Sequence, residues 1–417
     1  MKSSKPFRIE KEEVWRAYKL VKANKGAAGV DDQSIEDFER RLGDNLFKIW
    51  NRMSSGSYHP PPVRTVEIPK KNGGKRVLGI PTVGDRVAQM VVKQRLEPKL
   101  EPYFHKDSYG YRPGKSAHDA LAVTRDRCWK YDWVVEFDIK GAFDNIDHAL
   151  LLRAVRKHTN NPWVILYVER WLTAPFQSGD RLIERTKGTP QGGVISPLLA
   201  NLFLHYAFDM WMGREYPHNP FCRYADDGLV HCRTLEEAQS LRANLQARFS
   251  GCKLELNPDK TRIVYCKCSA RQGEFPVITF DFLGYTFGPK RARSSRGYFV
   301  GYLPAVSRKA TKAFRDKVRS SGIHRQVDKQ VSDIADMWNP ILRGWIQYYG
   351  RFYPSALYPT FNHFNLVLER WIRRKYRKYR YRKIAAHDWL GRIAKQQPLL
   401  FVQLAIRQTS GWSVRAV

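Results

Sequence analysis

The chain has 417 residues, of which 43% are hydrophobic and 13% aromatic, so it can bury a sizeable core and is not a disordered tail. Lys and Arg number 72 against 40 acidic residues, and the formal net charge of +32 indicates a polyanionic partner, either nucleic acid or a membrane surface. No apolar run approaches the ~20 residues that a bilayer span needs, so the sequence predicts no membrane-spanning helix.

The N-terminus and the cysteines favour a cytoplasmic protein. Residues 1–5 lead into a charged segment with no apolar stretch of the signal-peptide kind. Six cysteines are too sparse for a disulfide scaffold, and none forms a C-x-x-C pair typical of zinc sites. We therefore expect reduced thiols and no membrane attachment.

The first predicted elements are helical. Residues 8–24 read as a helix, and Gly26–Asp31 as a glycine-rich turn. A second helix is predicted from Ser34 to about Met53, opened by Ser34 with Asp37 three residues later, a capping pattern.

A hairpin and a helix follow. Three prolines, residues 60–62, forbid helix and force extended chain. Val63–Pro69 and Lys75–Ile80 then read as paired strands joined by a glycine-rich turn. Apolar residues at helical spacing predict a helix over 85–101.

The middle of the chain alternates strands with helices, and its end is helical. Val134–Asp138 reads as a buried strand, and Phe221–Cys232 as a hairpin. The further predictions are a helix at 236–250, strands at 254–256, 262–265 and 281–287, and helices from about 305 through 327–349 and 362–381.

Positive charge is concentrated at the end. Residues 301–417 contain 23 Lys and Arg but only 6 acidic residues. With no repeat or low-complexity linker in the sequence, this shift near residue 300 is the best domain-boundary signal.

Three aspartates are candidates for metal-dependent chemistry. Asp138 ends an apolar strand, and Asp226 and Asp227 are adjacent in a predicted turn. Neighbouring acids repel each other unless a cation offsets their charge, and Mg²⁺ prefers such oxygen ligands. Two such ions could clamp an in-line phosphoryl transfer. In isolation, however, an Asp-Asp turn is more typical of an ordinary exposed hairpin.

The surrounding sequence favours the metal site over the ordinary hairpin. Residues 137–148 (FDIKGAFDNIDH), followed by Tyr224–Asp227 (YADD), resemble the palm of a reverse transcriptase, and most closely the group II intron-encoded class. Other blocks match in order, at residues 26–31, 68–81, 109–118, 188–199, 260–261, 282–285 and 338–345. So many ordered blocks make a chance resemblance implausible.

The resemblance implies an α+β right-hand polymerase. It would have fingers and an antiparallel palm sheet, followed by an α-helical thumb, also called the maturase domain X, and a basic C-terminal module. The expected domains are an N-terminal extension (1–60), fingers and palm (61–300), a helical thumb (301–366) and a basic nucleic-acid-binding segment (367–417).

The implied activity is RNA-directed DNA polymerisation from a primer 3′-hydroxyl by two-Mg²⁺ nucleotidyl transfer, with Mn²⁺ as a substitute. Asp138, Asp226 and Asp227 would be catalytic, and Ile139 would join them in binding metal. The implied partners are deoxynucleoside triphosphates, an RNA template with a DNA primer, target DNA and a group II intron RNA, whose splicing and retrohoming the protein would assist.

The resemblance also assigns a nucleotide pocket. Lys70 and Arg76 flank the hairpin turn and could fold over a triphosphate, although Lys71 and Lys75 could serve instead. Phe143 would exclude the ribose 2′-hydroxyl by sterics, but a Phe in this setting is otherwise more often a core residue. Gln191 would support the incoming nucleotide beside its sugar or base, and Arg112 would contact the template or single-strand backbone. Lys260 would neutralise phosphate or donate a proton to pyrophosphate.

Residues 370–382 interleave arginines and lysines with aromatic residues. Such a run is usually a solvated helix face. Here we expect Arg373, Arg374, Arg377 and Lys378 to bind RNA phosphates. The neighbouring rings would offer stacking surface to unpaired bases; they are Trp371, Tyr376, Tyr379 and Tyr381. Trp345, Tyr348 and Tyr349, at helical spacing, are expected in the thumb core.

The chain shows no Cys/His-rich tail of the HNH-nuclease kind, which fits the shorter, class C members of the family. A bacterial, nucleoid-associated location is expected. Two alternatives stay open: an RNA-binding maturase with dispensable polymerase activity, and a free-standing reverse transcriptase used in defence or repair. The genomic neighbourhood would separate the latter from an intron-borne enzyme.

Overall fold

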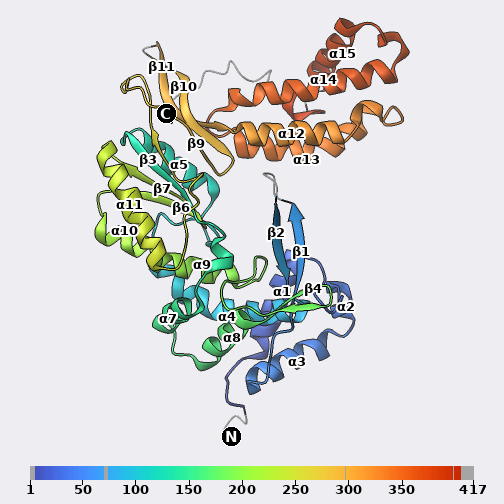
Figure 1. Ribbon diagram of the computed structural model, residues 1–417. Helices are drawn as coiled ribbons and strands as arrows, with labels where there is room; N and C mark the ends of the chain where they lie inside the picture. Colours follow the sequence, from blue (N-terminus) through green and yellow to red (C-terminus); the bar gives the residue numbers. More distant parts are fainter. Residues whose placement is uncertain (1–4, 70–73, 296, 398, 405–417) are drawn as a thin grey trace. The chain divides into compact units, whose positions relative to one another are not determined.

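A computed structural model describes residues 5–69, 74–295, 297–397 and 399–404 (Figure 1). The chain forms two compact units. The first comprises Met1–Ala120, Val135–Val230 and Glu236–Arg262, and the second comprises Leu121–Val134, His231–Leu235 and Ile263–Val417.

The first unit opens with three helices, α1 (Lys11–Asn24), α2 (Ile35–Arg40) and α3 (Leu42–Ser55). The capping pattern is confirmed, because the Ser34 side chain accepts from the Asp37 amide and the Asp37 side chain accepts from the Ser34 amide. The single helix predicted from Ser34 to Met53 is wrong. Arg41 leaves helical geometry, with φ −127° and ψ 43°, and the Asn45 side chain donates 2.9 Å to the Phe38 carbonyl that the break exposes.

The predicted hairpin forms one side of a four-stranded sheet ordered β2-β1-β4-β5, with β2 at the edge. Strands β1 (Val63–Pro69) and β2 (Lys75–Ile80) pair antiparallel, with Arg64 opposite Ile80 and Pro69 opposite Lys75. Strand β1 also runs parallel to β4 (Phe176–Ser178), which pairs antiparallel with β5 (Arg181–Ile183).

Helix α4 (Val83–Leu100) is largely buried, polar residues such as Asp85 and Gln89 included, and contacts α1, α3 and α8 (Pro162–Thr173). It begins at Thr82, whose side chain accepts from the Asp85 amide. This buried helix anchors the sheet region and the helices around it.

A second sheet is ordered β6-β7-β3-β8, and its strands are β3 (Trp133–Asp138), β6 (Phe221–Tyr224), β7 (Asp227–Cys232) and β8 (Arg262–Tyr265). Helix α11 (Leu235–Gly251) covers one face, where Phe249 packs on Phe137 of β3. The predicted hairpin at 221–232 is confirmed, but Leu254–Leu256 forms no strand and makes only an isolated bridge from Leu256 to Ile139.

Other helices surround these strands. They are η1 (Glu101–Tyr103), α5 (Ala117–Cys128), α6 (Ala142–Asn145), α7 (His148–His158), α9 (Ser196–Leu204), a π-helical turn η2 (His205–Asp209) and α10 (Met210–Glu215).

The second unit contains a three-stranded antiparallel sheet, β11-β10-β9, of β9 (Phe280–Phe282), β10 (Tyr285–Ser294) and β11 (Gly297–Val306). The single strand predicted at 281–287 is wrong, because Leu283 and Gly284 both adopt positive φ and turn the chain between β9 and β10.

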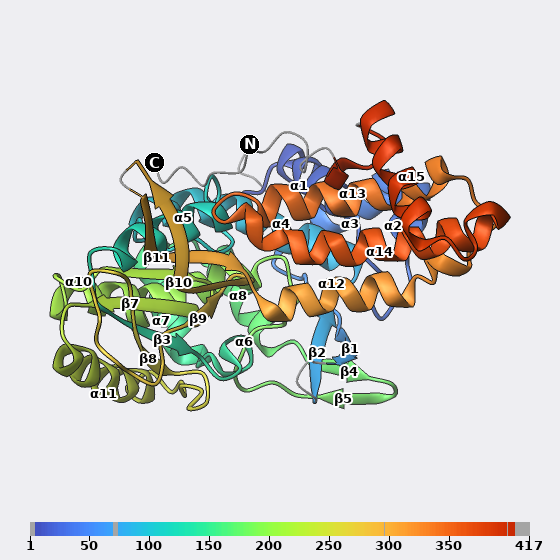
Figure 2. The same ribbon diagram turned by 90° about the horizontal axis from the view of Figure 1, so that it is seen from above.

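From Arg308 to Gln396 the second unit is predominantly helical, as predicted. Helices α12 (Arg308–Ser320), α13 (Val331–Tyr349) and α14 (Tyr358–Lys375) lie side by side, and α15 (Lys383–Gln396) packs on α14 (Figure 2). Short 3-10 turns connect them, at η3 (Ile323–Arg325), η4 (Pro354–Leu357) and η5 (Arg377–Tyr379). Trp345 and Tyr349 pack against the apolar core of this bundle, and the Tyr348 hydroxyl donates to the Leu283 carbonyl at 2.8 Å.

The architecture is thus α+β, with antiparallel sheets and a helical C-terminal region, as expected. None of the helices in the described ranges has both the length and the apolar character that a bilayer crossing requires. None of the six cysteines, all within the described ranges, forms a disulfide bond, and five of them are buried. The division into four domains stays a prediction.

Burial of His231 makes stability depend on pH. Burial, with the charge of Arg127, lowers the pKa of His231 from 6.5 to about 3. The unfolded chain therefore takes up a proton below pH 6.5 that the folded chain does not, so this stabilisation is full above pH 6.5 and is lost as pH falls. Between pH 7.5 and 5 we expect a loss of about 2 kcal/mol in the free energy of unfolding from this residue.

Urea unfolding of the parent and of His231→Gln across this pH range measures the effect. The variant should show a shallower pH dependence, whereas the exposed-site control His59→Gln should follow the parent. Identical pH dependences for the parent and His231→Gln would contradict the assignment.

Candidate active site

Three aspartates meet at the ends of two neighbouring strands. Asp138 is the last residue of β3, and the pair Tyr224–Asp227 closes the β6–β7 hairpin around Ala225 and Asp226. Gly228 lets the strands approach, because a Cβ there would lie 2.1 Å from the Phe137 ring. The buried strand and the tight turn therefore bring the predicted acids together.

Burial and mutual repulsion both weaken the acidity of Asp226 and Asp227. Burial, together with the charge of Asp138, raises the pKa of Asp226. Burial and the charges of Asp226 and Asp138 raise the pKa of Asp227 to about 7, although part of this residue is exposed. The site thus concentrates negative charge that its own surroundings only partly offset.

Lys260 supplies part of that offset. Its Nζ lies 3.0 Å from both carboxylate oxygens of Asp138, and the Asn257 amide donates to Oδ2 at 3.3 Å. The Asn257 backbone N–H also donates to the Asp138 carbonyl at 2.8 Å, which fixes the loop carrying Lys260 beside the strand end. The sequence-predicted Lys260 therefore joins the acid cluster.

The cluster fits hard divalent cations by its donor chemistry. Its ligands are carboxylate oxygens, the class that Mg²⁺ prefers, and Ile139, whose side chain is buried, can contribute only its backbone carbonyl. In the part of the chain that the structure describes, no three acidic, His or Cys side chains are already arranged as a metal-binding group. A cation bound at Asp138 would compete with Lys260 for its carboxylate oxygens.

The predicted nucleotide residues Arg76 and Gln191 are in contact. Arg76 Nε donates to Gln191 Oε1, and Gln191 Nε2 donates to Asp144 at 3.2 and 3.3 Å. The polar chain joins the hairpin strand β2 to the loop before α9. Lys70 lies outside the described residues. Asp144 is a participant that the sequence did not single out.

The loop that carries Gln191 is fixed by a buried side chain of helix α4. Gln89 Oε1 accepts from the Val194 and Ile195 amides at 2.8 and 3.3 Å, and its amide donates to Asp85 at 2.9 Å. Asp85 is fully buried and also accepts from Tyr58 and Trp171, both at 2.8 Å. This network was missed, since a buried Asp and Gln four residues apart in a helix carry no distinctive sequence signal.

Glycine permits the loop's close approach to β2. A Cβ on Gly192, which has φ +120°, would lie 2.4 Å from the Gly79 carbonyl oxygen, and the Gly79 amide donates to the Gln191 carbonyl at 2.8 Å.

Phe143 lies beside the acids. It is buried and meets Tyr111 edge-on, with ring centroids 6.4 Å apart. Both rings line a small cavity that Asp226 and Ala225 also line. This position is compatible with a role at the sugar and with a packing role.

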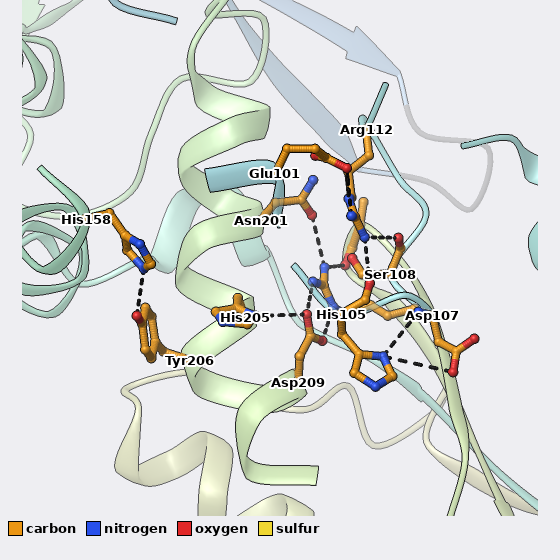
Figure 3. Close-up of polar contacts among 12 residues, drawn as sticks. Glu101, His105, Asp107, Ser108, Arg112, His158, Asn201, His205, Tyr206 and Asp209 are labelled. Carbon is orange, nitrogen blue, oxygen red and sulfur yellow. Dashed lines mark hydrogen bonds and ion pairs between the residues drawn. The ribbon is translucent and has the colours of Figure 1, made fainter. Parts of the chain in front are cut away.

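Arg112 does not occupy a template-facing position, which corrects the sequence-based assignment. Its side chain is only 6% exposed and pairs with Glu101 at 2.7 and 3.0 Å (Figure 3). The remaining nitrogen donates to the His105 and Ser108 carbonyls at 2.6 and 2.7 Å. The donors of Arg112 are engaged within the protein, where they fix the 105–108 segment. We therefore no longer assign Arg112 a contact with nucleic acid.

The basic residues near the C-terminus surround a pocket of about 420 Å³ in the second unit. Its lining is basic, and consists of His324, Arg370, Arg373, Arg374, Lys375, Arg377 and Arg380. Three of the four predicted RNA contacts line it, whereas Lys378 instead lies 5.0 Å over the Tyr379 ring. Such a pocket suits an anion.

The stacking surface predicted for residues 370–382 is largely wrong. Trp371 and Tyr379 are buried in the bundle core, and Tyr376 packs against it. Only Tyr381, 85% exposed, is available to a base. The helix predicted to 381 ends at Lys375, because Tyr376 turns to extended geometry.

Comparison with known proteins gives two family matches. Residues 68–287 match the reverse transcriptase (RNA-dependent DNA polymerase) family, and residues 311–389 match the group II intron maturase-specific domain.

Individual relatives agree with these matches. Protein YkfC of Escherichia coli is 31% identical over 333 residues, covering 69% of this chain and 83% of YkfC. The group II intron-encoded protein LtrA of Lactococcus lactis is 38% identical over 192 residues, covering 45% of this chain and 32% of LtrA. A putative COX1/OXI3 intron 1 protein of Saccharomyces cerevisiae is 29% identical over 197 residues, covering 47% of this chain and 23% of that protein. The match thus spans a third or less of these intron-encoded relatives.

Proposed function

Because this chain belongs to the reverse transcriptase family and carries a group II intron maturase-specific domain, we propose that it copies RNA into DNA by two-Mg²⁺ nucleotidyl transfer and also binds group II intron RNA. The single observation that carries the polymerase proposal is the convergence of Asp138, Asp226 and Asp227 beside Lys260. Assistance to splicing and retrohoming, with target DNA as a further partner, belongs to the same proposal.

The acids hold the metal in this proposal. Asp138, Asp226 and Asp227, with the Ile139 carbonyl, would be the protein ligands, and Mn²⁺ would substitute for Mg²⁺. Bound divalent ions supply Lewis-acid stabilisation of the attacking and leaving oxygens. The raised pKa values of Asp226 and Asp227 support the proposal, because they reflect carboxylates that are buried and also face the negative charge of neighbouring aspartates.

In this proposal, the basic residues around the acids and the loop that carries Gln191 bind the incoming nucleotide. Lys70 and Arg76 would neutralise the triphosphate, and Gln191 would exchange its contact with Arg76 for the incoming nucleotide. Lys260, released from Asp138, would face phosphate. Phe143 would lie against the sugar and exclude a 2′-hydroxyl.

The basic pocket of the second unit binds the RNA backbone in this proposal. Besides Arg373, Arg374 and the neighbouring Lys375, its lining includes three more arginines of the same segment: Arg370, Arg377 and Arg380. His324 from η3 completes the lining. Packing such cations together is unfavourable without an anion, so RNA phosphates are the fitting occupant.

Asp226→Ala should abolish primer extension while the protein stays folded. Loss of a metal ligand should remove about 4 kcal/mol of transition-state stabilisation, or roughly 1,000-fold in rate. The measurement is extension of a labelled DNA primer on an RNA template with Mg²⁺, with folding checked by circular dichroism. The exposed-residue control Asp180→Ala should extend normally, and near-parental extension by Asp226→Ala would sink the active-site assignment.

Phe143→Ala should shift the sugar preference toward ribonucleotides by at least about tenfold, or ~1.4 kcal/mol. Because the truncation leaves a cavity, Phe143→Leu, which keeps more apolar volume, should show a smaller shift in the same direction. Single-nucleotide insertion kinetics with both sugars provide the measurement. Selectivity equal to the parent's in both folded variants would make Phe143 a packing residue alone.

Neutralising Arg373, Arg374 and Arg377 to Gln should weaken RNA binding and flatten its salt dependence. Each phosphate contact contributes about 0.7 to the log–log slope on single strands, so the slope should drop by about 2. Extension of a short primer at low salt should persist, since the acid cluster is unchanged.

A matched triple variant on α12, Lys309, Lys312 and Lys317 to Gln, removes the same charge outside the pocket. This α12 variant should flatten the salt dependence of RNA binding less than the pocket variant does. Equal slopes for the parent and the pocket variant would show that the arginines are solvated and bind no RNA.

A further inference from the structure

The turn that presents Asp226 is held in a backbone conformation that its sequence disfavours. Ala225 has φ +56°, in the left-handed region that residues with a Cβ seldom adopt. Gly110 presses on the same residue, since a Cβ there would lie 2.4 Å from the Ala225 nitrogen. Such strain persists only where the surroundings over-determine it.

A buried arginine provides that restraint. The side chain of Arg223, on β6, is 0% exposed, and one of its terminal nitrogens donates to the Ala225 carbonyl at 2.9 Å. The same nitrogen donates to Asn201 Oδ1 at 3.0 Å. The other two nitrogens form a bidentate pair with Asp209, at 2.6 and 2.7 Å.

The two anchors of Arg223 come from one helical segment. Asn201 lies on α9 and Asp209 ends the π-helical turn η2, and Figure 3 shows both with His205 along this segment. The Asn201 amide also donates to the Gly110 carbonyl at 2.7 Å. Helix α9 therefore contacts both Arg223 and Gly110, the two residues that lie against Ala225. An isolated π-helical turn within a helix is frequent at functional sites.

The segment that carries Gly110 is fixed in turn. The Arg223 amide donates to the Asp107 carbonyl at 3.0 Å, and the Tyr109 amide donates to the Arg223 carbonyl at 2.8 Å. Arg112 secures the beginning of this segment through the His105 and Ser108 carbonyls. The buried contacts thus close around the turn from β6, from α9 and from the 105–110 segment.

We propose that Arg223, anchored by Asp209 and Asn201, is a positioning residue that fixes the Ala225 carbonyl and thereby sets the direction of the Asp226 carboxylate. The inference rests on the polymerase function proposed above. The planar fork of arginine can satisfy Asp209, Asn201 and the carbonyl at once, whereas lysine offers a point charge without that geometry.

The test compares single-nucleotide insertion by the parent and by Arg223→Lys, which keeps the positive charge beside Asp209. We expect kcat to fall by at least about tenfold, because small displacements of a catalytic group cost about 10²-fold. The KM for the nucleotide should change by less than about threefold.

Rescue separates positioning from stability. Ala225→Gly places a residue in the turn for which positive φ carries no steric penalty. In the Arg223→Lys background it should recover most of the lost kcat, whereas the loss of a purely structural contact would not be repaired by removing the Ala225 methyl.

Arg271→Lys is the matched control. Arg271 also combines a carboxylate, Asp132 at 2.7 Å, with main-chain carbonyls, those of Cys128 and Cys266, but it lies outside the acid cluster. It should lower the melting temperature and leave kcat at the parental value. Asn201→Ala, which retains the Arg223–Asp209 pair, gives a second route should Arg223→Lys fail to fold, and Ala225→Gly should rescue it in the same way.

Parental kcat in a folded Arg223→Lys or Asn201→Ala protein would overturn the inference. So would a loss of kcat that Ala225→Gly leaves unrepaired. A parent that extends no primer, or an active Asp226→Ala variant, would instead overturn the proposed function, so the two failures are distinguishable.

Discussion

Repulsion among three aspartates is the constraint around which the first unit is organised. Asp138, Asp226 and Asp227 are close enough for burial and mutual charge to raise the pKa of Asp227 to about 7. Lys260 offsets part of that charge from the side, and the β6–β7 turn fixes the spacing of the two adjacent acids. The fold thus maintains a concentration of negative charge that divalent cations would relieve, which is a requirement of metal-dependent phosphoryl chemistry.

The buried Arg223–Asp209 ion pair lies beneath the turn that carries Asp226. Replacing a buried ion pair with apolar residues is often neutral in stability, but removing one partner costs about 3–5 kcal/mol, so the pair contributes geometry more than net stability. The Arg223 guanidinium outweighs the burial that would otherwise raise the pKa of Asp209, and the pKa lies below its ordinary value. Asp209 is therefore ionised and paired with the Arg223 guanidinium beneath the turn, and the hydrogen bond from that guanidinium to the Ala225 carbonyl restrains the strained residue.

The strand ends and their acids could be predicted because apolar runs that terminate in Asp carry a local signal. Contacts set by tertiary packing could not. Arg112 resembled a nucleic-acid ligand because nothing in its loop reveals Glu101, eleven residues earlier, as its partner. Trp371 was misread within a basic run, although its spacing from Phe364 and Leu368, i, i+4 and i+7, marks the buried face of α14. The basic run around Trp371 predicts an exposed face, but the helical periodicity of the apolar residues determines which side chains of α14 are buried.

The central claim is that the acid cluster polymerises DNA on an RNA template. The most direct measurement is extension of a DNA primer by the parental chain on an RNA of defined sequence, with Mg²⁺ and all four deoxynucleotides, followed by sequencing of the product. The account predicts a DNA strand complementary to the RNA and dependent on the divalent ion. Product formed without regard to the template, or no product from folded protein with Mg²⁺ or Mn²⁺, would contradict it.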